Sequence, residues 1–261
     1  MTRALLGLVD LSGRAHQAVK DSELDLENED LDRIGVLIGS GSGGLPETDQ
    51  QAEIRVTRGV NRMSPYYIPM MLVNMAAANI SHTFNLTGYT NTCVTACAAS
   101  TQAIGEACNI LRNGEADVML AGGTHSMIHE LGMTGFNRLT ALSTHRESPQ
   151  EASRPFSRNR DGFVMGEGAG VLVLESEESV IRRGVKPIAE LAGYGASSDA
   201  YHVTQPAPDG EGAARAIMKA FEEANIGPSE VGYINAHGTS TPMNDRLETA
   251  AVKASFGDQA Y

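Results

Sequence analysis

Cys97 is a candidate nucleophile because of the residues on either side of it. An apolar and β-branched run, residues 92–96, precedes it, and the small residues 98–101 open a segment with helical periodicity. Strand, sharp turn, cysteine and helix in this order form a nucleophile elbow. A helix N-terminus favours the thiolate, and such cysteines have pKa values as low as ~3.5–7.5. A cysteine flanked by alanines is otherwise a buried hydrophobe, and the residues alone leave that alternative open.

His237 is the second candidate. It lies in Asn-Ala-His-Gly-Thr-Ser-Thr-Pro, residues 235–242, directly after an apolar run at 231–234 that predicts a strand. Open α/β sheets collect ligand-binding groups at the carboxyl ends of their strands, although a turn histidine would look the same. A thiolate with a histidine suggests acyl transfer through a thioester. A thiol protease uses the same pair, but no protease signature surrounds Cys97.

Two other groupings resemble metal sites. His125 and His129 are four residues apart, as in a helical metal pair, but no third ligand stands out. Cys93 and Cys97 have the same spacing, yet Ser100 stands where an iron–sulfur motif would need a further cysteine. We therefore predict no metal, and we expect Cys93 and Cys108 to be buried hydrophobes.

The segment Gly39–Gly44 matches the dinucleotide-binding pattern G-x-G-x-x-G after a predicted strand. In that fingerprint the loop opens a helix whose N-terminus binds a pyrophosphate. Here Glu47 and Asp49 would place two carboxylates where the phosphates would sit. The pattern therefore favours a tight turn that lines a pocket over a nucleotide site.

The elements that must position these residues follow a pattern that recurs three times: an amphipathic helix, an apolar strand and a loop of small residues. The copies combine helices near 14–21, 98–112 and 214–221 with strands at 34–38, 118–121 and 231–234. A further buried strand is predicted at 169–174 and a helix near 177–183. Helices that alternate with short apolar strands indicate a buried α/β sheet system, here with a duplicated architecture.

Composition excludes several classes of protein. The 261 residues carry a formal net charge of −12, which argues against a general binder of nucleic acids or anionic membranes. Three cysteines in a chain of this length indicate a reducing compartment and not a disulfide framework. No stretch approaches the ~20 apolar residues of a membrane helix. We therefore expect a soluble, cytoplasmic protein.

The motifs around Cys97 and His237 together resemble the β-ketoacyl-acyl-carrier-protein synthases, and most closely the type II elongating enzymes. The resemblance covers nearly the whole chain, in the family's order. Its further segments are 64–65, 73–75, 117–123, 152–156, 160–170 and 197–202. It implies the thiolase-type fold, in which two similar halves form α-β-α-β-α layers, and it implies a homodimer.

The resemblance also implies roles for single residues. Cys97 would carry the acyl chain as a thioester. His237 would donate a hydrogen bond to the malonyl thioester carbonyl and stabilise the enolate formed as CO₂ leaves, before a Claisen condensation. Four further residues have implied roles: Thr239 and Thr241 would bind the pantetheine amides, and Asp245 and Glu248 would support the site.

The same resemblance implies where the substrates bind. Ser42 and Phe136 would line the acyl pocket. Arg62 and Arg138 would form part of a basic docking patch for acyl carrier protein, which is acidic in this family. The substrates would arrive on its phosphopantetheine, and no other cofactor is implied.

The chain departs from the family pattern in what it lacks. The family's second active-site histidine, in Lys-Ser-x-Thr-Gly-His, and its later Gly-Phe-Gly-Gly loop do not occur. We therefore expect an internal portion of a synthase, lacking both ends and unable to condense substrates alone. Its expected parts are residues 1–184, with the nucleophile, and a partial second half, 185–261, with the His-Gly-Thr-Ser-Thr loop.

Three alternatives compete with an elongating synthase. A polyketide-type ketosynthase shares both motifs, and the sequence does not separate the two pathways or define the acyl length. A non-catalytic chain-length partner of the same fold usually lacks the cysteine, so Cys97 disfavours it. Thiolase itself is disfavoured because His-Gly-Thr-Ser-Thr belongs to the carrier-protein synthases.

Overall fold

A computed structural model describes residues 3–260 and divides them into two compact units. The first comprises residues up to 133 together with 166–189, and the second comprises 134–165 together with 190 onward. Residues 134–165 thus pack with the C-terminal part of the chain, although they precede the division that we expect near residue 184. That division between homologous halves stays a prediction.

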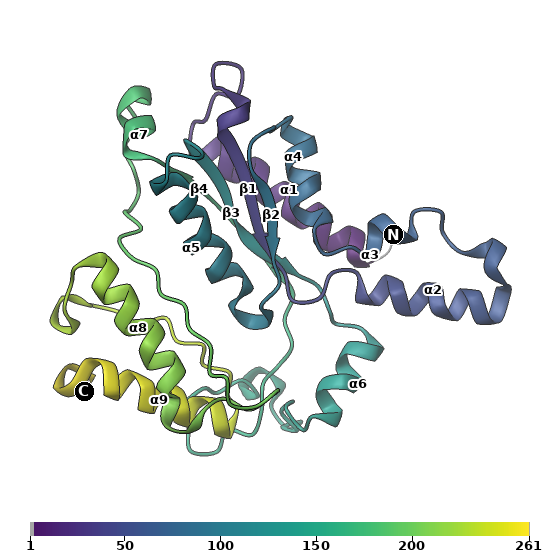
Figure 1. Cartoon of the computed structure of the whole chain (residues 1–261). Coiled ribbons are helices and arrows are strands. Elements are labelled where there is room, and N and C mark those ends of the chain that lie inside the picture. The colour runs from purple at the N-terminus through teal and green to yellow at the C-terminus, as the bar shows by residue number, and fades with distance from the viewer. Residues whose placement is uncertain (1–2, 261) are drawn as a thin grey trace. The chain divides into compact units, whose positions relative to one another are not determined.

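The first unit is built on a four-stranded sheet in the order β2-β1-β3-β4 (Figure 1). Strands β1 (Ile34–Gly39), β2 (Thr90–Cys93) and β3 (Val118–His125) are parallel, and β4 (Gly168–Glu175) runs antiparallel to β3. Gly39, the last residue of β1, pairs with both Cys93 and Gly123. The carboxyl ends of the three parallel strands therefore meet at one edge of the sheet.

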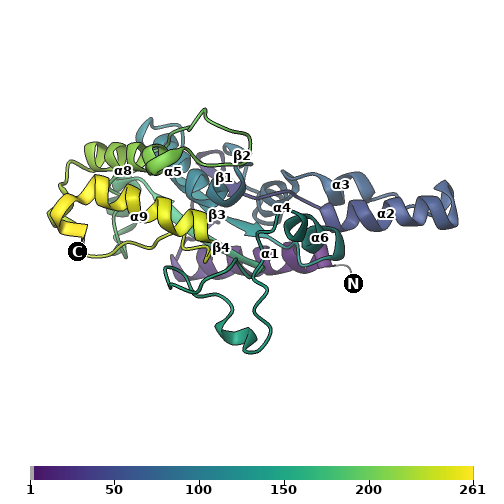
Figure 2. The ribbon, with the colours of Figure 1, turned by 90° about the horizontal axis from the view of Figure 1, so that it is seen from below.

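Helices cover both faces of this sheet (Figures 1 and 2). Alternate strand residues point to opposite faces. Ile34, Val36 and Ile38 pack with α1 (Arg3–Asp21) and α4 (Met75–Phe84), whereas Leu37 packs with α5 (Ala99–Arg112). Every residue of β1 is buried, which confirms the predicted buried strand at 34–38. The helix predicted near 14–21 is confirmed but begins earlier, at Arg3.

The strand predicted at 169–174 exists as β4, but it is not fully buried. Val171 and Val173 pack against the α1 side of the sheet, whereas Leu172 is 50% exposed. The prediction of a buried strand is therefore wrong for one face. The reason is that β4 lies at the edge of the sheet, where this face is only partly covered. Leu174 packs against the cluster that includes α5, whereas Leu172 is left exposed.

The remaining helices of the first unit lie around the sheet. Helices α2 (Leu45–Arg58) and α3 (Tyr67–Met71) project from it together (Figures 1 and 2). Helix α7 (Glu177–Arg183) has the predicted bounds, and the chain passes between the two units within α6 (Glu130–Arg138). Short 3₁₀ turns occupy Leu31–Arg33, Val60–Arg62 and Ala96–Ala98.

The second unit contains α8 (Glu211–Ala224), which confirms the helix predicted near 214–221, and α9 (Pro242–Phe256). Phe221 and Phe256 join them by an edge-to-face contact of 5.2 Å between ring centroids. Its 3₁₀ turns are Pro149–Glu151, Pro208–Gly210, Pro228–Glu230 and Gly257–Ala260.

The strand predicted at 231–234 is not formed, and Tyr233 is 80% exposed. A strand needs a hydrogen-bonded neighbour, and no described residue pairs with this segment. Between residues 3 and 260, no helix is both long and apolar enough to cross a membrane.

Candidate active site

Cys97 sits at a sharp turn between β2 and α5. Strand β2 ends at Cys93, a 3₁₀ turn covers Ala96–Ala98, and α5 begins at Ala99. Ala96 has a φ of 51°, in the left-handed region that residues other than glycine rarely adopt. The Cys97 side chain is exposed at the N-terminal end of the helix. This is the elbow geometry predicted from the sequence, with the cysteine presented to solvent.

Two glycines let the elbow approach the sheet. A Cβ atom at Gly39 would overlap the backbone of Ala99, and one at Gly123 would overlap the Ser100 side chain. Only glycine therefore fits at position 39, the end of β1, and at position 123 in β3, where the first turn of α5 packs. This close packing places Cys97 beside the carboxyl ends of three strands.

The two other thiols lie in different surroundings. Cys93 is buried, and its Sγ lies 3.4 Å from Oε2 of Glu106. Burial and the neighbouring carboxylate raise the pKa of Cys93 to about 12. Cys108 is buried within α5, as expected for a small hydrophobe.

The glycine-rich turn after β1 holds Ser42 against His125, the last residue of β3. Ser42 Oγ lies 3.0 Å from Nε2 of His125 and 3.7 Å from Sδ of Met127. The turn does open a helix, α2, with Gly44 as its N-cap. However, the carboxylate-bearing Glu47 is buried in the first turn of that helix, where a phosphate would bind. These contacts favour the packed turn.

His125 and His129 do not lie together on a helix. His125 ends a strand, and His129 precedes α6 with its Nδ1 3.6 Å from a carboxylate oxygen of Asp49. Burial lowers the pKa of His125, which favours the neutral imidazole. Within residues 3–260, no group of three or more His, Cys, Asp or Glu side chains could hold a metal ion.

In the second unit, Glu248 holds the loop that carries His237. Its two carboxylate oxygens accept hydrogen bonds from the backbone N–H groups of His237 (2.6 Å) and Gly238 (2.8 Å). Glu248 projects from α9, so the helix positions the loop. The His237 side chain is exposed.

Asp245, also on α9, holds the next part of the loop and is 1% exposed. Its carboxylate accepts hydrogen bonds from the backbone N–H groups of Phe156 (2.7 Å) and Ser240 (3.2 Å), and it pairs with Nε of Arg160 at 3.2 Å. Ser240 has a φ of 66°, and its Oγ accepts a hydrogen bond from the Arg154 N–H at 3.0 Å. Together these contacts stabilise the positive φ of Ser240, a backbone conformation that would otherwise be unfavourable.

Thr239 and Thr241 lie side by side, with their hydroxyl oxygens 2.8 Å apart. Thr241 is also the N-cap of α9, because its Oγ1 accepts a hydrogen bond from the Asn244 N–H at 3.2 Å. One hydroxyl group thus has a structural role in addition to the predicted contact with pantetheine.

The other predicted residues are placed as follows. Phe136 makes an edge-to-face contact with Phe163 at 5.2 Å between centroids. Arg62 and Arg138 are exposed, near the ends of α2 and α6. The structure thus brings Cys97 and Ser42 to the same edge of the sheet in the first unit. It gathers five predicted residues around one loop of the second: His237, Thr239, Thr241, Asp245 and Glu248.

Three residues that hold the site were not assigned a role by the sequence reasoning: His125, Arg160 and Ser240. Arg160 lies in the polar segment 155–161, and Ser240 lies between the two candidate threonines. Their positions within these sequence motifs were the only sign in the sequence that they could have a role. Their partners are 81 to 86 residues away, so no local pattern could identify the contacts.

Asp161 supplies a test of the loop that contacts Ser240. The hydroxyl of Ser143 and the backbone N–H of Thr144, with a smaller contribution from Arg154, lower the pKa of Asp161 from 3.8 to about 2. A carboxyl with a depressed pKa stabilises the fold above its ordinary pKa, and the effect is lost as pH falls toward 2. We expect Asp161→Asn to destabilise the protein at neutral pH and to flatten the fall of its urea midpoint between pH ~4 and ~2. Equal slopes for both proteins would contradict this.

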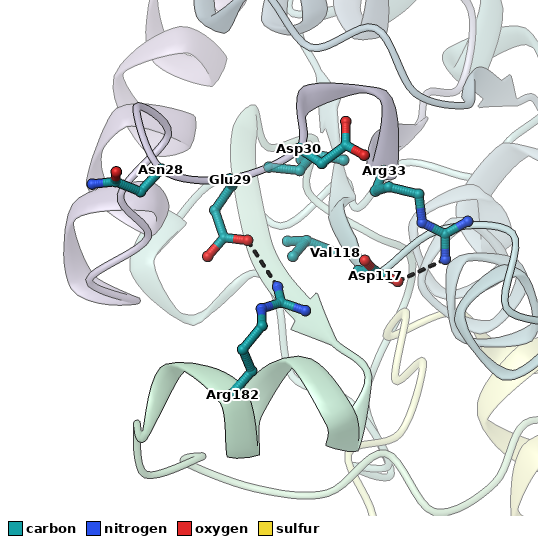
Figure 3. A pocket seen from close by; sticks show the side chains of 8 residues that line it. Asn28, Glu29, Asp30, Arg33, Asp117, Val118 and Arg182 are labelled. Atoms are coloured by element: carbon teal, nitrogen blue, oxygen red, sulfur yellow. Dashed lines mark hydrogen bonds and ion pairs between the residues drawn. The ribbon is translucent and has the colours of Figure 1, made fainter.

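A cavity of about 240 Å³ lies at the amino ends of β1 and β3 (Figure 3). It is lined by two ion pairs, Arg33 with Asp117 (2.6 Å) and Arg182 with Glu29 (2.8 Å). Cys97 follows the carboxyl end of β2, so this cavity belongs to the opposite end of the sheet. The charges of these two pairs neutralise one another, and the carboxylate of Asp30 is a further charged group in the lining.

Two family models match this chain. Residues 11–179 match the family model "Beta-ketoacyl synthase, N-terminal domain", and residues 188–261 match "Beta-ketoacyl synthase, C-terminal domain". The 3-oxoacyl-[acyl-carrier-protein] synthase 2 of Synechocystis sp. is 47% identical over 95% of this chain. The protein of the same name from Staphylococcus aureus is 47% identical over 94%. The chain spans 59% of the length of each relative.

Solved structures agree on the fold. A ketosynthase in complex with its type II PKS acyl-carrier protein, bound to the hexaketide, has a TM-score of 0.93 and 35% identity, covering 98% of this chain and 64% of that one. A beta-ketoacyl synthase from Burkholderia phymatum has a TM-score of 0.89 and 33% identity, covering 96% and 61%. The expected thiolase-like α/β fold is confirmed.

Proposed function

Because this chain belongs to the beta-ketoacyl synthase family, we propose that its protein condenses an acyl chain, bound to Cys97, with malonyl-acyl-carrier protein. The product is a 3-oxoacyl-carrier protein, formed in fatty-acid elongation. The observation that carries the proposal is the exposed Cys97 at the first turn of α5, after a left-handed Ala96. The proposal includes a homodimer and a cytoplasmic location, and it requires no cofactor beyond the carrier's phosphopantetheine.

The proposed reaction has three steps. The Cys97 thiolate attacks the acyl thioester and releases the carrier thiol. Malonyl-carrier protein then loses CO₂, and His237 donates a hydrogen bond to the thioester oxygen of the resulting enolate. The enolate carbon attacks the Cys97 thioester, and the tetrahedral intermediate expels the Cys97 thiolate. Thr239 and Thr241 would hold the pantetheine arm.

Several contacts support these roles. The dipole of the fourteen-residue helix α5 favours a thiolate at its N-terminus. Glu248 fixes the backbone at His237 by two short hydrogen bonds, so the imidazole extends from a rigid support. Preorganised donors of this kind lower the energy of a developing oxyanion because they need no reorganisation during the reaction.

Carrier docking needs a basic surface on an acidic chain. Residues 54–105 contain no Asp or Glu, although the whole chain has a net charge of −12. Three exposed arginines fall at the start of this stretch, Arg55, Arg58 and Arg62. We propose that Arg62 and its neighbours on α2 contact the carrier, with Arg138 as a second contact.

Reversing the charge at Arg62 should weaken carrier binding. We expect Arg62→Glu to lower the association rate constant roughly three- to tenfold at low ionic strength, with a smaller effect at high salt. Stopped-flow or surface-binding kinetics at two salt concentrations measure this. Lys20→Glu, at the exposed end of α1, makes the same charge change elsewhere and should leave the rate constant near the wild-type value. An unchanged rate constant for Arg62→Glu would remove Arg62 from the docking surface.

The direct test of the function uses the complete protein with acyl- and malonyl-carrier protein. Mass spectrometry should detect first an acyl adduct on Cys97 and then a 3-oxoacyl-carrier product. Absence of both would overturn the proposal. An acyl adduct without a 3-oxoacyl product would support acyl transfer to Cys97 and contradict condensation.

A polyketide-type ketosynthase is the second candidate, favoured by the ketosynthase neighbour bound to a hexaketide. The two functions differ in how the product is used next. An elongating enzyme of fatty-acid synthesis should not extend its own 3-oxo product, whereas a polyketide enzyme should. Repeated condensation on an unreduced 3-oxoacyl chain would therefore select the polyketide function.

A further inference from the structure

The contact between Ser42 and His125 has no role in the condensation chemistry. The two side chains are half-buried, and 3.0 Å separates Ser42 Oγ from His125 Nε2. His125 ends β3, and Ser42 lies three residues beyond the end of β1. Because β1 lies between β2 and β3, both residues share the sheet edge from which the chain leads to Cys97.

The imidazole fills space that small residues leave open. A Cβ atom at Gly41 would lie 2.7 Å from Cε1 of His125, so the ring packs directly on the turn. Met127 also contacts the turn, with its sulfur 3.7 Å from Ser42 Oγ. The small side chain at position 42 therefore does not leave an empty apolar space, because a polar ring occupies it.

Both groups of the pair can donate and accept hydrogen bonds. Burial lowers the pKa of His125, which keeps the ring neutral at neutral pH, although the charge of Glu167 acts in the opposite direction. A neutral imidazole has one donor and one acceptor nitrogen, and a hydroxyl has both capacities. The pair can thus bind a third polar group without a change of protonation.

We infer that His125, held by Ser42, gives the acyl-binding region beside Cys97 a polar end, which selects acyl chains that carry a hydroxyl or carbonyl oxygen. The inference rests on the proposed function and on the place in the acyl pocket that the family resemblance implies for Ser42. An alkyl terminus placed against this pair would strip it of water and offer no hydrogen bond in return. A hydroxyl or carbonyl oxygen on the acyl chain, placed at the same point, would form a hydrogen bond with the pair. His125 is therefore a specificity-determining residue.

The test measures acylation of Cys97 in the complete protein. Two series of pantetheine thioesters of increasing chain length, n-alkanoyl and ω-hydroxyalkanoyl, are compared by intact-protein mass spectrometry. Over a limited range of lengths, we expect the hydroxylated chain to react about tenfold faster than its alkyl counterpart. The ratio should fall toward one in His125→Leu and in Ser42→Ala, the second being a small change that the turn accommodates.

His129→Leu is the matched control. It makes the same substitution four residues away, on a histidine that pairs with Asp49 and not with Ser42, and it should keep the wild-type ratio. If both series acylate Cys97 and the ratio of hydroxyalkanoyl to alkanoyl rates is the same in wild type and variants, the inference is overturned. The proposed function would then still stand. Failure of every thioester to acylate Cys97 would overturn both.

Discussion

Cys97→Ala should abolish condensation in the complete protein, with a loss of at least about 10⁴-fold, because an enzyme that loses its nucleophile keeps only the catalysis due to binding. Cys97 is exposed at a helix N-terminus, where the thiolate is favoured. The buried Cys93, whose pKa is raised to about 12, stays protonated and unreactive. A thiol-directed electrophile followed by peptide mapping should therefore label Cys97 first.

Cys108→Ala is the matched control for this prediction. Cys108 is 8% exposed within α5, so the loss of its side chain should cost about 1 kcal/mol of stability or less and leave condensation intact. Urea unfolding and the condensation assay separate these effects. Preferential labelling of Cys93 or Cys108, or full activity in Cys97→Ala, would contradict the assignment.

Asp245→Ala should destabilise the second unit by about 3–5 kcal/mol, the usual cost of removing one partner of a buried ion pair. The substitution leaves the Arg160 guanidinium, 18% exposed, without its carboxylate. It also removes the acceptor of the backbone N–H groups of Phe156 and Ser240. Because Ser240 is held at a positive φ by this network, the loop that carries His237 should lose order and activity should fall as well.

Chemical unfolding, followed by circular dichroism, measures this prediction. Asp245→Asn keeps one acceptor oxygen but not the charge, so we expect an intermediate loss. Asp258→Ala removes an exposed carboxylate in the turn after α9, and its effect should stay within about 0.5 kcal/mol. A loss for Asp245→Ala as small as that of Asp258→Ala would show that the buried network does not hold the loop.

The sequence alone determined the local elements and the candidate nucleophile. Apolar spacing at 3.6 residues placed α5 and α8, and a continuous apolar run placed β1. These patterns are reliable because helix and strand each repeat over a few residues, and burial of one face depends on that repeat. The strand-to-helix junction at Cys97 was predictable for the same reason.

Strand pairing was decided only in three dimensions. Residues 231–234 have the composition of a strand but form none, since composition does not supply a hydrogen-bonded neighbour. Residue Leu172 has the pattern of a core position but is half exposed, since the edge of a sheet is a property of strand order and not of the strand itself.

The supports of the site were also decided by the tertiary structure. The family resemblance could place Asp245 and Glu248 near the His-Gly-Thr-Ser-Thr loop. Their hydrogen bonds to the loop backbone, however, form only because α9 packs against the loop. The positive φ of Ser240 is likewise seen only in the folded chain. The pair of Ser42 and His125 joins residues 83 positions apart. Sequence periodicity carries information about neighbours along the chain. Contacts over such separations arise from the way parallel strands bring their carboxyl ends to a common edge.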